Sequence, residues 1–248
     1  MNNQATLEKL SQMKLYGMQT AFKASLDSKL HGQLMADELL AHLVESEWLD
    51  REKRKTERYI RSAHFRYQAS IEEIDYTTNR GLDKNQLLRL YDCSFIDKKE
   101  NLLITGPTGA GKSYLASALG YQACRLGYKV RYFNTAKLFS YMTMSKADHS
   151  YLRELNKLAT TQLLILDDFG LAPIEAHHRM MLMEIIEDRH GKHATLIASQ
   201  LPQEKWYGLF DDNTIADALL DRLVHNAHKI VIKGESMRKR QKPVSINE

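Results

Sequence analysis

The sequence predicts an α/β protein whose mostly parallel sheet is covered by helices on both faces. Five short apolar runs alternate with helical segments in the second part of the chain, and this alternation is typical of parallel strands joined by helical crossovers. The runs lie at residues 102–104, 130–133, 163–166, 194–198 and 230–232. Residues up to about 68 show helical patterns only, and residues 69–100 carry short, mixed elements that lead into the second part. We therefore expect a small all-helical N-terminal domain, residues 1–68, followed by an α/β domain, residues 69–248.

The composition is that of an ordinary globular protein. The 248 residues are 43% hydrophobic and 27% charged, with a net charge of +4, so any basic partner surface must be local. The two cysteines form no ligand or redox motif, and His177 and His178 are interpreted as surface or packing residues. No apolar run approaches the roughly 20 residues that cross a bilayer, and the N-terminus lacks a signal layout. We expect a cytoplasmic protein with no membrane segment.

Amphipathic helices account for the N-terminal domain. Apolar residues recur at helical spacing over residues 6–30 without a proline, which predicts one helix there. Asp37 is the expected N-cap of a second helix. The apolar face of this second helix comprises Leu40, Leu43, Val44 and Trp48. Its sequence becomes strongly basic after Trp48.

The stretch GPTGAGKS fills every position of the phosphate-loop motif G-x-x-x-x-G-K-[ST]. It follows an apolar strand and precedes a helix, as the motif requires. The glycines let successive backbone N–H groups face the α- and β-phosphates of a nucleotide, while Lys112 adds a charge for the β- and γ-phosphates and Ser113 a ligand for Mg²⁺. The predicted nucleotide-binding residues are Gly106, Pro107, Thr108, Gly109, Ala110, Gly111, Lys112 and Ser113.

Two carboxylates follow the third apolar run, in QLLILDDFG. Asp167 at the strand end can hold Mg²⁺ through water, together with Ser113. Asp168 can orient or deprotonate the attacking water. Most related hydrolases have Glu at the position of Asp168, so the shorter side chain affects the geometry and speed of hydrolysis.

Two further residues are candidates for contact with the γ-phosphate. Ser199 ends the strand ATLIAS and is either an ordinary strand end or a polar group that hydrogen-bonds the γ-phosphate or the lytic water. Thr214 is the expected cap of the helix that contains Arg222. Arg222 is either a surface residue or an arginine finger that reaches the nucleotide of a neighbouring subunit.

The motifs together resemble the AAA+ ATPases and, within them, the IstB/DnaC-like group. The resemblance is carried by GPTGAGKS, LLILDDFG, TLIASQLP, LLDRLVH and KGESMRKR, and near the N-terminus by LSQMKLYGM and EWLDREKRKTERYIRSAHF. It implies ATP-dependent self-assembly on DNA, remodelling of target DNA and recruitment of a transposase. It also implies that Asp167 and Asp168 are Walker B residues, Ser199 the polar sensor and Arg222 the intersubunit finger. Arg238 belongs to a motif that recurs in the group, but the spacing of the motif does not assign it a role.

The chain is short after the last apolar run. Sixteen residues follow Ile232, too few for the helical lid that closes over the base in many AAA+ proteins. We therefore expect no C-terminal helical lid, with the nucleotide held by the core domain and by neighbouring subunits. This favours a homo-oligomer with ATP at subunit interfaces.

A basic stripe on the second helix is the predicted DNA contact. Basic residues outnumber acidic ones between residues 51 and 66, and several are spaced by three or four positions, which places them on one helix face. The predicted DNA-binding residues are Arg51, Lys53, Arg54, Lys55, Arg58, Arg61 and Arg66. The alternative is a solvated helix face with internal ion pairs. Contacts to phosphates carry little sequence preference.

The sequence therefore predicts a Mg²⁺-dependent ATPase that oligomerises on duplex DNA, remodels it and recruits or stimulates a transposase. A DnaC-like helicase loader is one alternative, and it would prefer single strands. The other alternative is a DNA-binding scaffold that holds ATP with little turnover. It stays open because Asp168 stands where most related hydrolases have Glu.

Overall fold

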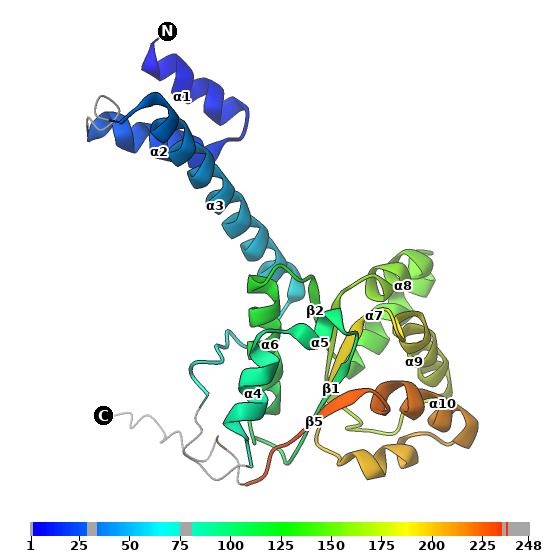
Figure 1. Cartoon of the computed structure of the whole chain (residues 1–248). Helices are drawn as coiled ribbons and strands as arrows, with labels where there is room; N and C mark the ends of the chain where they lie inside the picture. The colour runs from blue at the N-terminus through cyan, green and yellow to red at the C-terminus, as the bar shows by residue number, and fades with distance from the viewer. Residues whose placement is uncertain (1, 29–33, 75–80, 235–236, 238–248) are drawn as a thin grey trace, which may run out of the picture. The chain divides into compact units, whose positions relative to one another are not determined.

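The computed structural model describes residues 2–28, 34–74, 81–234 and 237, which form two compact units (Figure 1). The N-terminal unit comprises residues 1–58 and the larger unit residues 59–248. Arg238 lies outside the described residues, as does most of the chain after the last predicted apolar run. Among the described helices, none is both long and apolar enough to cross a membrane.

The N-terminal unit contains α1 (Asn3–Gln12), α2 (Tyr16–Asp27) and most of α3 (Ala36–Ala63). The prediction of one helix over residues 6–30 is wrong, because the chain turns between α1 and α2 and Lys14 adopts a left-handed φ of 60°. The turn allows the first amides of α2 to meet the carboxylate of Glu47 on α3. A helical apolar pattern cannot reveal such a break, because the same face continues on both sides of it.

The start of α3 also differs from the prediction. Asp37 lies inside the first turn and is not the N-cap. The side chain of Glu38 instead accepts a hydrogen bond from the backbone amide of Met35 at 2.9 Å, in the manner of a capping box. The expected apolar face is largely uncovered in this unit, since Leu40 and Trp48 are 59% and 58% exposed.

The larger unit is built on a five-stranded parallel sheet, as predicted. Its strands are β1 (Asn101–Thr105), β2 (Val130–Asn134), β3 (Leu163–Phe169), β4 (Ala194–Ser199) and β5 (Ala227–Val231). They are ordered β2-β3-β4-β1-β5, and all four neighbouring pairs are parallel. The last strand begins three residues before the predicted run at 230–232, because Ala227, His228 and Lys229 also pair with β1. Two of these three residues are polar, so they do not belong to an apolar run.

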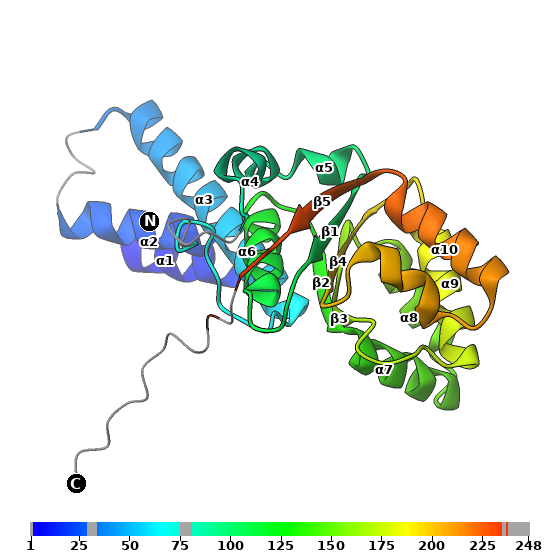
Figure 2. The ribbon, with the colours of Figure 1, turned by 90° about the horizontal axis from the view of Figure 1, so that it is seen from below.

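Helices cover both faces of the sheet (Figure 2), and the strand side chains alternate between them. Leu102 and Ile104 belong to a core with α4, α5 and α6, whereas Leu103 belongs to a second core with α7, α8, α9 and α10. The helices are α4 (Lys84–Tyr91), α5 (Ser94–Asp97), α6 (Lys112–Arg125), α7 (Thr135–Ala147), α8 (Tyr151–Ala159), α9 (Ala176–Arg189) and α10 (Asn213–Val224), with a 3₁₀ helix η2 (Gln203–Leu209). The strand order places the carboxyl ends of β1, β3 and β4 side by side.

Candidate functional site

The phosphate loop joins β1 to α6 and depends on its glycines. Gly109 and Gly111 have φ angles of 78° and 98°, in the left-handed region that favours glycine. A Cβ atom on Gly106 would lie 2.3 Å from the carbonyl oxygen of Ile232. Gly111 is the residue immediately before α6, so the loop ends at a helix N-terminus, where unpaired N–H groups favour an anion.

Lys112 and Ser113 begin α6 and lie beside the carboxylates of β3. The Ser113 hydroxyl donates to Asp167 Oδ1 at 3.0 Å. The Lys112 ammonium donates to the carbonyl oxygen of Pro107 at 2.8 Å. Burial lowers the pKa of Lys112, and the charges of Asp167 and Asp168 oppose this effect. The structure thus brings together the residues that the sequence assigned to phosphate (Lys112), to metal (Ser113 and Asp167) and to the attacking water (Asp168).

Asp167 is 1% exposed and lies in β3 among hydrogen-bond donors. In addition to Ser113, its carboxylate accepts from the Tyr132 hydroxyl and, at 3.3 Å, from Arg66 Nη1. Burial and the bond to Asp167 raise the pKa of Tyr132, so the phenol keeps its proton and remains a donor. Tyr132 lies on β2 opposite Ile165, two residues before the register partner of Asp167. Sequence reasoning did not identify it as part of the site.

Asp168 has a different environment from Asp167. Its φ of 55° is unusual for a residue other than glycine and turns the side chain out of the strand alternation. Its Oδ2 atom accepts from Asn134 Nδ2 and from Arg66 Nη1, both at 2.9 Å. Asn134 ends β2, and a polar residue directly after an apolar run was the sequence signal that could have found it.

Arg66, one of the predicted DNA-binding residues, lies at the carboxylates of β3 and not on α3. The chain leaves α3 at Ala63, and His64 has a φ of 58°. Arg66 therefore does not continue the face of that helix. Its guanidinium contacts Asp167 and Asp168 as described above.

The two polar residues at the end of β4, Ser199 and Gln200, have different environments. Ser199 is fully buried, and its hydroxyl donates to the Phe169 carbonyl at 2.7 Å and accepts from the Leu201 amide at 3.1 Å. The structure therefore places this hydroxyl between backbone groups and not at the loop. Gln200 is the residue that meets the phosphate loop, where its Oε1 accepts from the Thr108 hydroxyl at 2.6 Å.

Arg222 lies at the amino-terminal end of the strands, whereas the phosphate loop lies at their carboxyl-terminal end. Its carbonyl accepts from the side chain of Asn101, the first residue of β1, whereas the loop follows the last residue of that strand. A strand of this length separates the two by about 13 Å or more. Arg222 Nε lies 2.6 Å from Glu187 Oε2 as an ion pair, at an angle that makes no hydrogen bond. Asp212, and not Thr214, caps this helix.

The basic residues of α3 are partly paired with acidic residues one turn before them. Arg51 lies 2.7 Å from Glu47, and Arg54 lies 2.7 Å from Asp50. Lys55 lies 3.4 Å from Glu52. These carboxylates therefore neutralise part of the positive charge of the predicted DNA-binding stripe. Lys53, Arg58 and Arg61 are also exposed on α3.

A cavity of about 310 Å³ adjoins these groups. It is lined by the phosphate loop, Tyr67, Tyr114, Gln200 and Met237, together with Arg66 and Asp168. The backbone amide of Met237 donates to the Gly109 carbonyl at 2.9 Å. The aromatic rings offer an apolar wall beside the phosphate loop, and the hydroxyl and carboxylate of Ser113 and Asp167 are the hard oxygen ligands that suit Mg²⁺. These residues fit a nucleotide with its metal.

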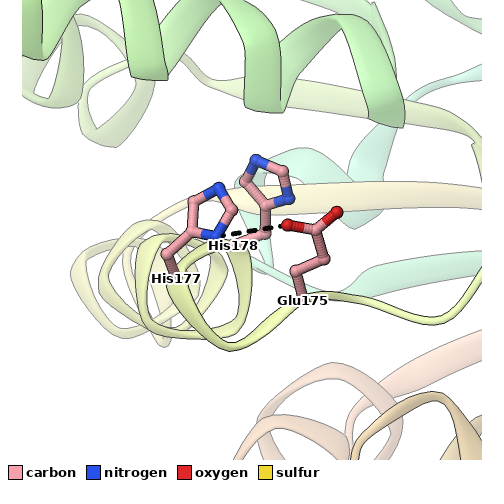
Figure 3. A group of neighbouring side chains, drawn as sticks. All are labelled: Glu175, His177 and His178. Atoms are coloured by element: carbon pink, nitrogen blue, oxygen red, sulfur yellow. Dashed lines mark ion pairs between the residues drawn. The ribbon is translucent and has the colours of Figure 1, made fainter.

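The histidines of α9 form a separate group (Figure 3). His177 Nδ1 lies 3.5 Å from Glu175 Oε2, and His178 stacks on Phe139 with ring centroids 4.5 Å apart. Burial and the neighbouring His177 lower the pKa of His178. Because the group lies at the first turn of a helix, where the backbone dipole disfavours a cation, these contacts support the packing interpretation.

Comparison with known proteins gives the family and the fold. The chain matches the model of the family described as IstB-like ATP binding protein over residues 8–245. It is 44% identical over 237 residues to the insertion sequence ATP-binding protein y4pL of Sinorhizobium fredii, covering 96% of this chain and 97% of the relative. It is 28% identical over 233 residues to the IS21 ATP-binding protein of Pseudomonas aeruginosa, covering 94% and 88%.

Solved structures agree on the fold of the larger part of the chain. A crystal structure of DnaI matches with a TM-score of 0.56 at 20% identity and covers 66% of this chain and 91% of DnaI. The DnaC helicase loader matches with a TM-score of 0.54 at 19% identity and covers 71% of this chain and 99% of DnaC. The parallel sheet with its phosphate loop is thus an AAA+ fold. The chain belongs to the IstB-like ATP-binding proteins of insertion sequences.

Proposed function

We propose that the chain is a Mg²⁺-dependent ATPase whose nucleotide state controls its assembly on duplex DNA, and that it acts as the helper of a transposase. The observation that carries this proposal is the hydrogen bond between Ser113 and Asp167 beside the buried Lys112. It joins the phosphate loop to the acidic end of β3, which is the pairing that Mg²⁺ and a triphosphate require. The family supplies the association with insertion sequences.

Each residue of the site has a distinct task in this proposal. Lys112 neutralises the β- and γ-phosphates, and Ser113 and Asp167 hold Mg²⁺, which supplies further charge neutralisation when bound. Asp168 orients the attacking water or takes its proton. Its Oδ2 atom already accepts two hydrogen bonds. These bonds lower the basicity of the carboxylate, so Asp168 becomes a stronger base when a donor turns away.

Arg222 acts on a neighbouring subunit in this proposal. It lies at the opposite sheet edge from the phosphate loop of its own chain, too far for a direct contact. In an oligomer, the amino-terminal ends of the strands in one subunit could face the carboxyl-terminal ends of the strands in the next. This arrangement would bring Arg222 to the nucleotide of the neighbouring subunit. ATP then stabilises the assembly, and hydrolysis releases it.

DNA binding is assigned to the exposed cations of α3. Lys53, Arg58 and Arg61 are exposed, and Arg51 and Arg54 can exchange their helix partners for phosphates. Such contacts bind without strong sequence preference. Assembly of several subunits would supply the energy to bend the duplex, which costs of order 1 to 6 kcal/mol.

The test is the mass of complexes formed on a duplex of about 60 base pairs and on the matching single strand, with a non-hydrolysable ATP analogue or with ADP. We expect large assemblies on the duplex with the ATP analogue, and none with Lys112→Ala. Preference for the single strand would favour a helicase loader. Arg222→Ala should bind the analogue normally but neither assemble nor hydrolyse ATP as wild type does.

The scaffold alternative is favoured by one observation, the pair of donors on Asp168. If hydrolysis by wild type, with duplex DNA present, equals that of Lys112→Ala and Asp168→Ala, the protein holds ATP without useful turnover. A rate at least tenfold above both variants would establish the ATPase.

A further inference from the structure

Arg66 joins the acidic end of β3 to the segment that follows α3. Its Nη1 atom lies 2.9 Å from Asp168 Oδ2 and 3.3 Å from Asp167 Oδ2. The Asp167 side chain is almost wholly buried, whereas that of Arg66 is 40% exposed. The carboxylate end of this ion pair is therefore shielded from water, and the interaction is stronger than that of a pair on the open surface.

The neighbours of Arg66 in the chain hold it in this position. His64 takes a left-handed φ of 58°, which redirects the chain after α3. The ring of Phe65 then stacks on Tyr121 with centroids 4.6 Å apart. A Cβ atom on Gly120 would lie 2.4 Å from the Phe65 ring, so this glycine leaves the space that the ring fills. Arg66 is thus presented to the carboxylates by an anchored aromatic residue.

The charges at the site compete with one another. Asp167 and Asp168 carry two negative charges, and Arg66 already pairs with both. A Mg²⁺ ion held by Ser113 and Asp167 would bring two positive charges to the same carboxylate. Cations that share a carboxylate weaken each other's binding, because each reduces the negative charge that the other experiences. A triphosphate, in contrast, is attracted by Arg66.

We propose that Arg66 is a positioning residue of the nucleotide site that sets the Mg²⁺ requirement of ATP binding. The inference rests on the proposed function. Arg66 stabilises the two carboxylates and attracts the phosphates when magnesium is scarce, and it opposes magnesium at the same carboxylates. Removal of its charge has two effects of opposite sign: nucleotide binds more weakly without Mg²⁺, and less Mg²⁺ is needed for tight binding.

The experiment measures the affinity of the full chain for a fluorescent, non-hydrolysable ATP analogue, first with EDTA and then over a series of free Mg²⁺ concentrations. For Arg66→Gln we expect the affinity in EDTA to fall by about three- to tenfold and the half-maximal Mg²⁺ concentration to fall by about the same factor. Arg66→Lys, which keeps the charge, should lie closer to wild type in both measurements. The exposed Arg89 of α4 gives the matched control, Arg89→Gln, which should change neither.

Two results would overturn the inference. If Arg66→Gln, shown to be folded by hydrogen exchange, leaves both quantities unchanged, Arg66 only fastens the chain to the sheet. If it weakens binding in EDTA and also raises the Mg²⁺ requirement, the substitution damages the site as a whole. Failure of the nucleotide-binding part of the proposed function, on which the inference rests, is visible separately, because wild type itself would then bind no analogue at any Mg²⁺ concentration.

Discussion

Glu47 of the N-terminal unit and Asp167 of the larger unit are both buried carboxylates that face an arginine, yet their other donors differ. They are 6% and 1% exposed. Glu47 accepts from the backbone amides of Gly17 and Met18 at 2.9 and 3.2 Å. These amides belong to the first turn of α2, where the helix itself offers no acceptor. Glu47 is therefore a helix cap supplied by another helix.

The described donors to the Asp167 carboxylate are all side chains. They come from Ser113, Tyr132 and Arg66, on three different segments. A side chain can change rotamer without breaking the backbone structure, so these donors can give way to a metal ion or turn toward a phosphate. The comparison teaches that burial and an arginine partner do not identify a functional carboxylate. The kind of donor is the informative feature.

The largest effect is expected for Asp167→Asn. Loss of the negative charge removes the partner of Mg²⁺, and the Mg²⁺-dependent affinity for an ATP analogue should fall by about 10- to 100-fold. Fluorescence titration of the full chain measures it. Glu47→Gln is the matched control, because it also neutralises a buried carboxylate, and it should leave nucleotide affinity unchanged. Equal losses in the two variants would break the distinction between the carboxylates.

Gly17→Ala tests the structural side of the comparison. Its Cβ atom would lie 2.3 Å from the carbonyl oxygen of Ser46 and 2.6 Å from Glu47 Cα. Backbone atoms cannot move aside cheaply, so we expect a loss of about 2 to 3 kcal/mol in the stability of the N-terminal unit. Hydrogen exchange of residues 16–27 measures it. Gly208→Ala is the control, since its Cβ would meet nothing within 4 Å; equal effects would contradict the packing argument.

The pH dependence of the N-terminal unit should follow Glu47. Burial acts to raise its pKa, but the hydrogen bonds from Arg51, Met18 and Gly17 together lower it below its ordinary value of 4.5. The unfolded chain therefore binds a proton at higher pH than the folded chain does. The contribution of the ionised Glu47 to the stability of the N-terminal unit is therefore fully present above about pH 4.5. It is lost as the pH falls through the lower pKa that Glu47 has in the folded chain.

Glu47→Gln should remove this pH dependence and cost about 1 to 2 kcal/mol at neutral pH, because a charged acceptor is replaced by a neutral one. Unfolding of the N-terminal unit, followed by hydrogen exchange between pH 3 and pH 7, compares the variant with wild type. If the Glu47→Gln variant still loses stability at low pH, another titratable group causes the pH dependence.

The sheet and the phosphate loop could be predicted because their signals are local. A buried parallel strand is a continuous apolar run, as in residues 163–166, and the loop needs glycines at fixed spacing. The five strands, their parallel arrangement and the covered faces follow from this alternation. The strand order places the end of β2 beside Asp167 and Asp168, and that adjacency explains why Asn134 and Tyr132 belong to the site.

The position of Arg66 could not be predicted, because it depends on one backbone turn. The sequence predicts one group of seven basic residues between positions 51 and 66, and the left-handed φ of His64 separates Arg66 from those on α3. The pairing of Arg51 and Arg54 was available in the sequence. Glu47 and Asp50 precede them by four residues, the spacing of helix ion pairs, and both lie just before the basic segment that begins at residue 51.

The smallest effects should separate Ser199 from Gln200 by the same rule of donor type. Ser199 bridges backbone groups of Phe169 and Leu201 and so resembles Glu47, whereas Gln200 meets the Thr108 side chain and so resembles Asp167. We expect Ser199→Ala to cost about 1 kcal/mol of stability without changing nucleotide affinity. Gln200→Ala should change the affinity for an ATP analogue by about two- to fivefold without changing stability, because it removes only a side-chain contact of the loop. Thermal unfolding and nucleotide titration of both variants measure these effects. If Ser199→Ala alters nucleotide affinity and Gln200→Ala does not, the Ser199 hydroxyl reaches the phosphates. Backbone hydrogen-bond partners would then not indicate a structural role in this protein.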